Sequence, residues 1–360
     1  MPAVELTWLA CDLKSGRIAE ELRSLTPSGA LERRLSLSSS GQLDLDLAGA
    51  PAQWESATDP GRTLLVAVDT YTSRPVWSGI VLTRAGGSDT VVQLGAATPE
   101  AYLDRRYTGA YSGIARDQAL IMSDLATAVL ADAPPIVVDA LAGSTPITYL
   151  LQDGDDRTVL SALQELAGME GAPEWTVDTV WADAAQTAVR LVLRVRPMIG
   201  VQSATPEAVF DLPGCIASYS LSESYESGRG ATVVRAWGDG EGAARLRGIE
   251  QTAADLITAG WCRWENRYTP SSGLTDPDQL TAHAVQALAQ QRTGTRTWTV
   301  DAVASQAPRL GLDWALGDSV HVQISSSPRH PLGAETVSRA YAWRLDPGAN
   351  RITPVLVEED

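Results

Sequence analysis

Two stretches of the sequence show the same order of features: a glycine, a strand-like run, a loop containing proline, a second run, a tight turn and a third run. The first stretch begins at Gly61 with GRTLLVAVD, continues as PVWSGIVLTR and returns as TVVQLGA. The second begins at Gly317 with GDSVHVQI, continues as TVSRAYAWRL and returns as RITPVLV. Runs of this kind bounded by turn residues are typical of strands. The repeated order predicts two similar small β-barrels; the alternative is a pair of unrelated β-meanders.

The first barrel is expected to occupy residues 1–97. QLDLDL (42–47) alternates without a break, so period 2 places its leucines inward and Asp44 and Asp46 outward. A solvated face is the preferred interpretation of these two carboxylates, and a catalytic pair is the alternative. Short strands at this spacing favour a barrel or a sandwich.

An α/β insert is expected over residues 98–205. Helix-like apolar stripes cover 117–131, with Asp117 as N-cap, and 155–168, with Asp155 or Asp156 as N-cap. Strand-like runs follow at 174–181 and 188–195. The DGDD run (153–156) lacks the ligand spacing of a calcium loop, so helix capping is the preferred interpretation.

The second barrel is expected over residues 206–360, interrupted by helical segments at 249–260 and 276–293. The second of these helices has Asp276 as N-cap and Pro277 at its first position. The predicted fold class is therefore mainly β with an α/β insert (α+β).

Composition excludes several classes of function. The formal net charge is −16, whereas surfaces that grip nucleic acid replace phosphate counterions with Lys and Arg. We find no run long enough to span a membrane and no signal peptide, so we expect synthesis in a cytoplasm and no membrane insertion. Cys11, Cys215 and Cys262 are scattered and form no CxxC; they are expected to be small core residues.

No catalytic, cofactor or metal site is predicted. The only histidines are His283, His321 and His330, and none lies in a recognised hydrolase, phosphate or dinucleotide motif. We expect His283 to flank the apolar stripe of its helix and His321 to lie on the less buried face of its strand. A metal shared by His321 and His330 is the alternative, but no third ligand is marked.

Two further features have a structural and a functional interpretation. WGDGEG (237–242) contains no basic residue and is interpreted as a loop, not a phosphate site. Trp261 and Trp264 are expected on opposite faces of a strand; a partner interface or core rim is preferred to a sugar site.

Several segments together resemble one family. They are the hairpin with SGRIAEEL, PVWSGIVLTR leading into AATPEAYLDRR, DQALIMSDLATAVL, TVLSALQELAG followed by PEWTV, LSESYESGRGATVVRAWGDG, and LGDSVHV with AYAWRL. In this order they resemble minor tail proteins of long-tailed phages infecting actinobacteria, most of all the baseplate or tail-tip hubs called Gp37-like or tail-associated hub proteins. Motif order across nearly the whole chain carries the resemblance.

The resemblance implies a virion structural protein, assembled in the host cytoplasm, and not an enzyme. Three copies would form a pseudo-six-fold ring of barrels that closes the distal end of the tail tube. Implied partners are the distal tail protein, the tape measure protein and other tail-tip or fibre proteins, while DNA passes through the channel without sequence-specific binding. The alternative function is a carbohydrate- or receptor-binding module of the tail tip.

Overall fold

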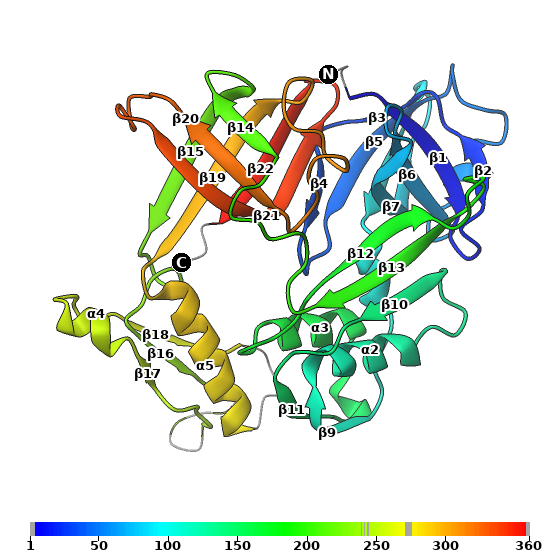
Figure 1. The fold of residues 1–360 in the computed structure, drawn as a ribbon. Helices are drawn as coiled ribbons and strands as arrows, with labels where there is room; N and C mark the ends of the chain where they lie inside the picture. Colours follow the sequence, from blue (N-terminus) through cyan, green and yellow to red (C-terminus); the bar gives the residue numbers. More distant parts are fainter. Residues whose placement is uncertain (1–3, 239, 241, 243–244, 271–275, 358–360) are drawn as a thin grey trace.

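The structure is a computed structural model that describes residues 4–238, 240, 242, 245–270 and 276–357. Two large sheets lie side by side, and most of the helices lie below them in the view of Figure 1. The predicted fold class, mainly β with an α/β insert, is confirmed.

The N-terminal sheet has seven strands, and the alternation predicted for QLDLDL is present in it: Leu43 and Leu45 are buried and Asp46 is exposed. A 3-10 turn, η1 (Ser56–Thr58), lies in the connection before β6. In order across the sheet the strands are β2 (Ile18–Glu21), β1 (Leu6–Asp12), β6 (Thr63–Asp69), β7 (Arg74–Ala85), β8 (Val91–Ala97), β5 (Ser40–Asp46) and β3 (Leu25–Pro27).

The C-terminal sheet also has seven strands, one of which comes from the N-terminal region: β4 (Leu31–Arg34) crosses over and pairs with β21. The other six, in order across the sheet, are β14 (Val209–Leu212), β20 (Ser319–Ile324), β21 (Ala334–Asp346), β22 (Arg351–Val357), β19 (Thr295–Val303) and β15 (Ile216–Ser224).

The two sheets repeat one strand order. In the first, β6, β7, β8, β5 and β3 are successive antiparallel neighbours; in the second, β20, β21, β22, β19 and β15 are. The order that the sequence predicted for the two stretches is therefore present in both. The strands on the other side of β6 and β20 differ, because β1 is antiparallel to β6 whereas β14 is parallel to β20.

The repeat extends to single hydrogen bonds. The Gly61 N–H donates to the Val81 carbonyl at 2.7 Å, and the Gly317 N–H donates to the Ala340 carbonyl at 2.8 Å. Both glycines have positive φ, +74° and +89°, which a residue with a side chain adopts only under strain. The opening glycines of the two stretches therefore occupy the same position in equivalent backbone turns.

A β-bulge also recurs at the same place. The β7–β8 register shifts between Val81 and Thr83, and the β21–β22 register shifts between Ala340 and Ala342. A bulge bends its strand and increases the local twist. Each bulge lies one residue beyond the glycine hydrogen bond, so the repeat includes this irregularity as well.

The α/β insert contains two small sheets and three helices. Asp117 caps α2 as predicted, accepting from the N–H groups of Ala119 and Leu120. The prediction of Asp155 or Asp156 as cap of the next helix is wrong: a 3-10 turn occupies these residues, and Thr158 is the cap. The elements are α1 (Glu100–Leu103), β9 (Tyr111–Asp117), α2 (Gln118–Ala128), β10 (Ile136–Ala140), β11 (Pro146–Leu151), η2 (Asp153–Asp155), α3 (Val159–Ala167), β12 (Glu174–Trp181) and β13 (Val189–Arg196).

A small α/β lobe, residues 225–294, leaves the C-terminal sheet after β15 and returns at β19. The predicted helix at 249–260 is wrong in its first half, because residues 251–252 pair with β16; the helix at 276–293 is confirmed as α5, with Asp276 as N-cap. The lobe contains β16 (Val233–Ala236), β17 (Gln251–Thr252), α4 (Ala254–Thr258), β18 (Glu265–Tyr268) and α5 (Pro277–Gln291).

Three hydrophobic cores follow this arrangement. One continuous core contains side chains of both large sheets, including Trp8 and Trp77 from the first and Phe210 and Trp298 from the second. A second core contains side chains of the insert together with Leu64, Val66 and Ile80 of the N-terminal sheet, and a small third one lies in the lobe. Because the two large sheets share a core, they are expected to hold one relative orientation.

Candidate functional site

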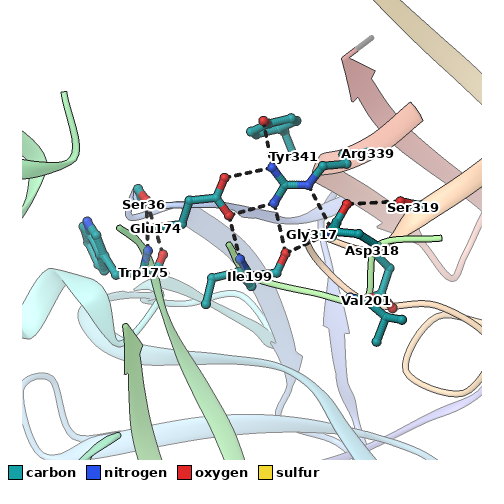
Figure 2. A network of polar contacts seen from close by, with 11 residues as sticks. Ser36, Glu174, Trp175, Ile199, Val201, Gly317, Asp318, Ser319, Arg339 and Tyr341 are labelled. Atoms are coloured by element: carbon teal, nitrogen blue, oxygen red, sulfur yellow. Dashed lines mark hydrogen bonds and ion pairs between the residues drawn. The ribbon is translucent and has the colours of Figure 1, made fainter. Parts of the chain in front are cut away.

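A network of polar contacts lies at the junction where the insert, the C-terminal sheet and the connector from β13 to β14 (residues 197–208) meet (Figure 2). Glu174 of β12 and Arg339 of β21 form a bidentate ion pair, with Nη1–Oε1 at 2.8 Å and Nη2–Oε2 at 2.7 Å. Arg339 is only 3% exposed. Bidentate pairs of this kind fix the planes of both side chains as well as their distance.

Arg339 also holds two backbone segments. Its Nη2 donates to the Ile199 carbonyl at 2.9 Å and its Nε donates to the Gly317 carbonyl at 3.2 Å. The Ile199 N–H in turn donates to Glu174 at 2.7 Å. One buried guanidinium therefore ties the connector, the turn before β20 and the insert together (Figure 2).

Two glycines let the connector cross the turn before β20. Gly200 and Gly317 have φ of +87° and +89°, and a Cβ on Gly317 would lie 2.5 Å from the Ile199 oxygen. The neighbouring Asp318 carboxylate accepts from the Val201 N–H at 2.6 Å and from the Ala315 N–H at 2.7 Å. The Gly-Asp pair at 317–318 is thus the crossing point of two chain segments.

A second buried ion pair joins the two large sheets directly. Arg309, in the connection before β20, contacts Asp69 at the end of β6 through two bonds of 2.6 Å. Burial opposes ionisation of Asp69, but the hydrogen bonds from Arg309 and the Tyr71 N–H outweigh it and hold the pKa of this carboxyl below its usual value. The Arg309 guanidinium also lies 4.8 Å from the centre of the Tyr71 ring.

A third connection joins β4 to the insert. Arg33 donates to Asp178 at 3.1 Å, to the Thr176 hydroxyl at 2.7 Å and to the Val177 carbonyl at 2.8 Å. In all three places charged groups are saturated by one another and by backbone. Such an arrangement fixes the relative orientation of the segments that it joins.

The three histidines lie in separate parts of the structure. His283 lies beside the apolar stripe of α5, and it is also buried, at 3% exposed, because its Nδ1 lies 2.9 Å from the Gly168 carbonyl at the end of α3. Burial lowers its pKa. His321 is half-buried on β20, and His330 lies 2.7 Å from the Tyr219 hydroxyl and stacks on that ring. Within the described ranges, no three His, Cys, Asp or Glu side chains are grouped to hold a metal.

Two of the three cysteines are buried and one is exposed. Cys11 and Cys215 are buried, as expected of core residues, and burial raises the pKa of their thiols to about 12 and about 11. Cys262 is exposed, so the core prediction is wrong for it. It lies in the coil before β18, where no sheet covers it.

Trp261 and Trp264 lie in the same coil, so the expectation of opposite strand faces is wrong. Both rings contact Tyr225, with centroids 5.3 and 6.0 Å away, and they are 41% and 54% exposed. This aromatic cluster was not predictable from strand periodicity, because the strand begins only at Glu265. Residues 239 and 241 of the glycine-rich loop at 237–242 lie outside the described residues.

No known family model matches the chain, and no curated protein sequence is detectably similar to it. Solved structures are similar in fold. A tail protein from Neisseria meningitidis aligns over 100% of this chain and 97% of its own, with a TM-score of 0.62 at 14% identity. A 43 kDa tail protein of prophage MuSo2 from Shewanella oneidensis aligns over 98% of both chains, with a TM-score of 0.58 at 13% identity. The chain has the fold of a phage tail protein.

A VgrG complex also contains a chain of similar fold. A chain of a Francisella PdpA–VgrG complex aligns over 99% of this chain and 58% of its own, with a TM-score of 0.54 at 9% identity.

Among the described residues, every helix is too short or too polar to cross a membrane.

Proposed function

We propose that this protein is a structural hub at the tip of a phage tail, in which three copies form a ring of six barrels. One observation carries the proposal: a chain with a tail-protein fold contains one sheet order twice, down to the glycine turn and the bulge. Residues 1–97 and 206–360 are the two barrel units, with 98–205 as the insert and the lobe as an insertion in the second barrel.

Two similar sheets in one chain would allow a trimer to bind a six-fold tail tube. Closed rings of different symmetry can meet only where they present matching surfaces. Three chains with two equivalent sheets each offer six similar surfaces, which match a six-fold tube on one side and a three-fold tip on the other. The buried pairs Asp69–Arg309 and Glu174–Arg339 support this role, because they hold the units of one chain in one orientation.

The proposed partners follow from this position. The ring would meet the distal tail protein on the side of the tube, contact the tape measure protein, and carry other tail-tip or fibre proteins. DNA would pass through its channel without binding. The insert, with 14 acidic and 7 basic residues, is the most acidic part of the chain and suits a surface that DNA must leave freely. The host group expected from the resemblance is actinobacterial.

Light scattering of the purified chain tests the ring. We expect a mass three times the chain mass of 38.2 kDa. Class averages in electron microscopy should show six similar barrels around a three-fold axis. A protein that stays monomeric at every concentration, or forms a two-fold dimer, would contradict the proposal.

A receptor-binding module is the second candidate, favoured by the exposed cluster of Tyr225, Trp261 and Trp264. Rigid, partly exposed aromatic rings are frequent in binding surfaces. A glycan array with the wild type and with Trp264→Ala separates the candidates. A hub gives no signal in either sample, whereas a receptor module gives a signal that the variant loses.

A further inference from the structure

The two sheets differ at one strand edge. In the C-terminal sheet, β4 pairs with residues 342–345 of β21, beyond Arg339, where the pairing with β20 stops. The Leu35 N–H, directly after β4, extends this contact to the Tyr341 carbonyl at 2.9 Å. Taking the shared bulge as the reference, Tyr341 corresponds to Leu82 and Ala342 to Thr83. The equivalent edge in the N-terminal sheet therefore begins at Leu82 and includes residues 82–85 of β7. On that side of β7 the pairing with β6 stops at Ile80, and within the described residues no strand follows it.

The side chains along these two strand edges differ in solvent exposure. In the C-terminal sheet, where β4 is paired, Tyr341 is half-buried, Ala342 is 7% exposed and Trp343 is 2% exposed. In the N-terminal sheet Leu82 is 52% exposed, and Thr83 and Ala85 are exposed as well. One repeat therefore has a covered edge where the other has an open one.

The open edge is protected only in part. The bulge at Leu82 twists it, and the Arg84 side chain donates to the Glu55 carbonyl and the Thr58 hydroxyl, but Leu82 and Thr83 remain exposed. Strand edges pair readily with other chains unless lysine, proline, a short strand or a covering segment prevents it. Other edges of the two sheets have such devices: β3 is short and contains Pro27, and Arg329 donates to the Leu221 carbonyl of β15 at 2.6 Å. Residues 82–85, LTRA, contain neither lysine nor proline.

We infer that a second copy of this chain covers residues 82–85, and that its lobe (225–294) provides the contact; this inference rests on the proposed ring. In the first repeat, β4 lies in the chain between β3 and β5 and crosses to the other sheet. In the second repeat, the lobe lies in the same chain position, between β15 and β19.

Ring closure turns this correspondence into a contact. In a ring of alternating barrels, one rotation relates each barrel to the next. Within one chain, β4 of the first barrel contacts β21 of the second. The same rotation then places the lobe of the second barrel against β7 of the next copy. The lobe has a suitable surface, because β18 is the last strand of its described sheet and Trp264, directly before it, is 54% exposed. Strand addition at such an edge supplies backbone hydrogen bonds, and the flanking side chains supply selectivity.

A charge on the edge tests the contact. Leu82→Lys places a lysine where proteins use it to block strand pairing, and the exposed position leaves the single chain folded. We expect light scattering to shift from three chains to one, with an unchanged far-ultraviolet circular dichroism spectrum. The matched control is Ile114→Lys, because Ile114 is an isoleucine on β9 that is 75% exposed and lies away from this edge; it should remain trimeric.

A photo-crosslinker at position 82 identifies the occupant without weakening the ring. With Leu82→p-benzoylphenylalanine, we expect a crosslinked dimer whose linked peptide lies within residues 225–294. A trimer in which the link maps to another part of the chain, or in which Leu82→Lys changes nothing, overturns this inference and leaves the ring standing. A monomeric wild type overturns the ring itself, which separates the two failures.

Discussion

Asp69 and Arg309 lie 240 residues apart in the chain, yet they form a bidentate ion pair at 2.6 Å in which both side chains are 1% exposed. Their position between the two large sheets means that neither charge can regain water unless the sheets separate. A buried charge is tolerated only while its partner is in place. The pair therefore couples the relative placement of the sheets to the stability of the chain.

Removing one partner should cost more than removing both. Arg309→Met leaves a buried carboxylate without its cation, and we expect the free energy of unfolding to fall by about 3–5 kcal/mol. Asp69→Leu combined with Arg309→Met should recover part of that loss, because no charge remains buried. Urea unfolding of the wild type, both single variants and the double variant measures this. A double variant as unstable as the sum of the singles would show that the pair acts independently at its two ends.

The same pair gives a pH dependence with a defined sign. The pKa of Asp69 is lowered in the folded chain, so the unfolded chain takes up a proton first as the pH falls. The stabilisation is complete above the ordinary aspartate pKa of about 3.9 and is lost as the pH drops below it. We expect the unfolding free energy of the wild type to fall more steeply between pH 5 and pH 3 than that of the double variant. Parallel curves would contradict this assignment.

The strands of the repeat were predictable because their information is local. Alternating or apolar runs and flanking turn residues define β6, β7, β8 and their counterparts within a few residues of their observed bounds. The shared bulge left no signal in the sequence, since Leu82 and Tyr341 differ in size and polarity. Backbone geometry, not side-chain identity, is what the two repeats have in common.

The junctions were not predictable, because their partners come from distant parts of the chain. The pairing of β4 with β21 joins residues 31–34 to 342–345, and nothing in LERR marks it for another sheet. His283 shows the same limit: the helical period placed it beside an apolar stripe, whereas the carbonyl of Gly168 in a separate unit determines its burial. Tertiary contacts decided both cases.

His283 should make the docking of the lobe dependent on pH. Its Nδ1 contact with Gly168 and the bond from Gln279 Nε2 to the Thr148 carbonyl, both 2.9 Å, join α5 to the insert. A polar groove of about 430 Å³ lies between α3 and α5 beside them, lined in part by Arg157 and Glu165. Because burial lowers the pKa of His283, the docked state loses stability as the pH falls below the ordinary histidine value of about 6.5.

Hydrogen exchange, corrected for intrinsic rates, measures this effect. We expect α5 and the end of α3 to exchange faster at pH 5 than at pH 7.5 in the wild type. His283→Gln should remove the difference between the two pH values, because glutamine does not titrate. A pH response retained in full by His283→Gln would assign it to Glu165 or to another neighbouring group.

The repeated glycine turn supplies a matched pair for the last prediction. Gly61 and Gly317 make the same hydrogen bond and have φ of +74° and +89°, so alanine at either position suffers the same backbone strain of about 1–2 kcal/mol. Around Gly61 a Cβ would meet nothing within 4 Å, whereas at Gly317 it would lie 2.5 Å from the Ile199 oxygen. Gly317→Ala must therefore also displace the connector that Arg339 and Glu174 hold. We expect it to destabilise the chain by about 1–3 kcal/mol more than Gly61→Ala, the range for overpacked sites, and to expose residues 197–208 to limited proteolysis. Thermal and urea unfolding of both variants measure the difference; equal losses without new cleavage would mean that the connector crosses the turn loosely and that the junction does not orient the insert.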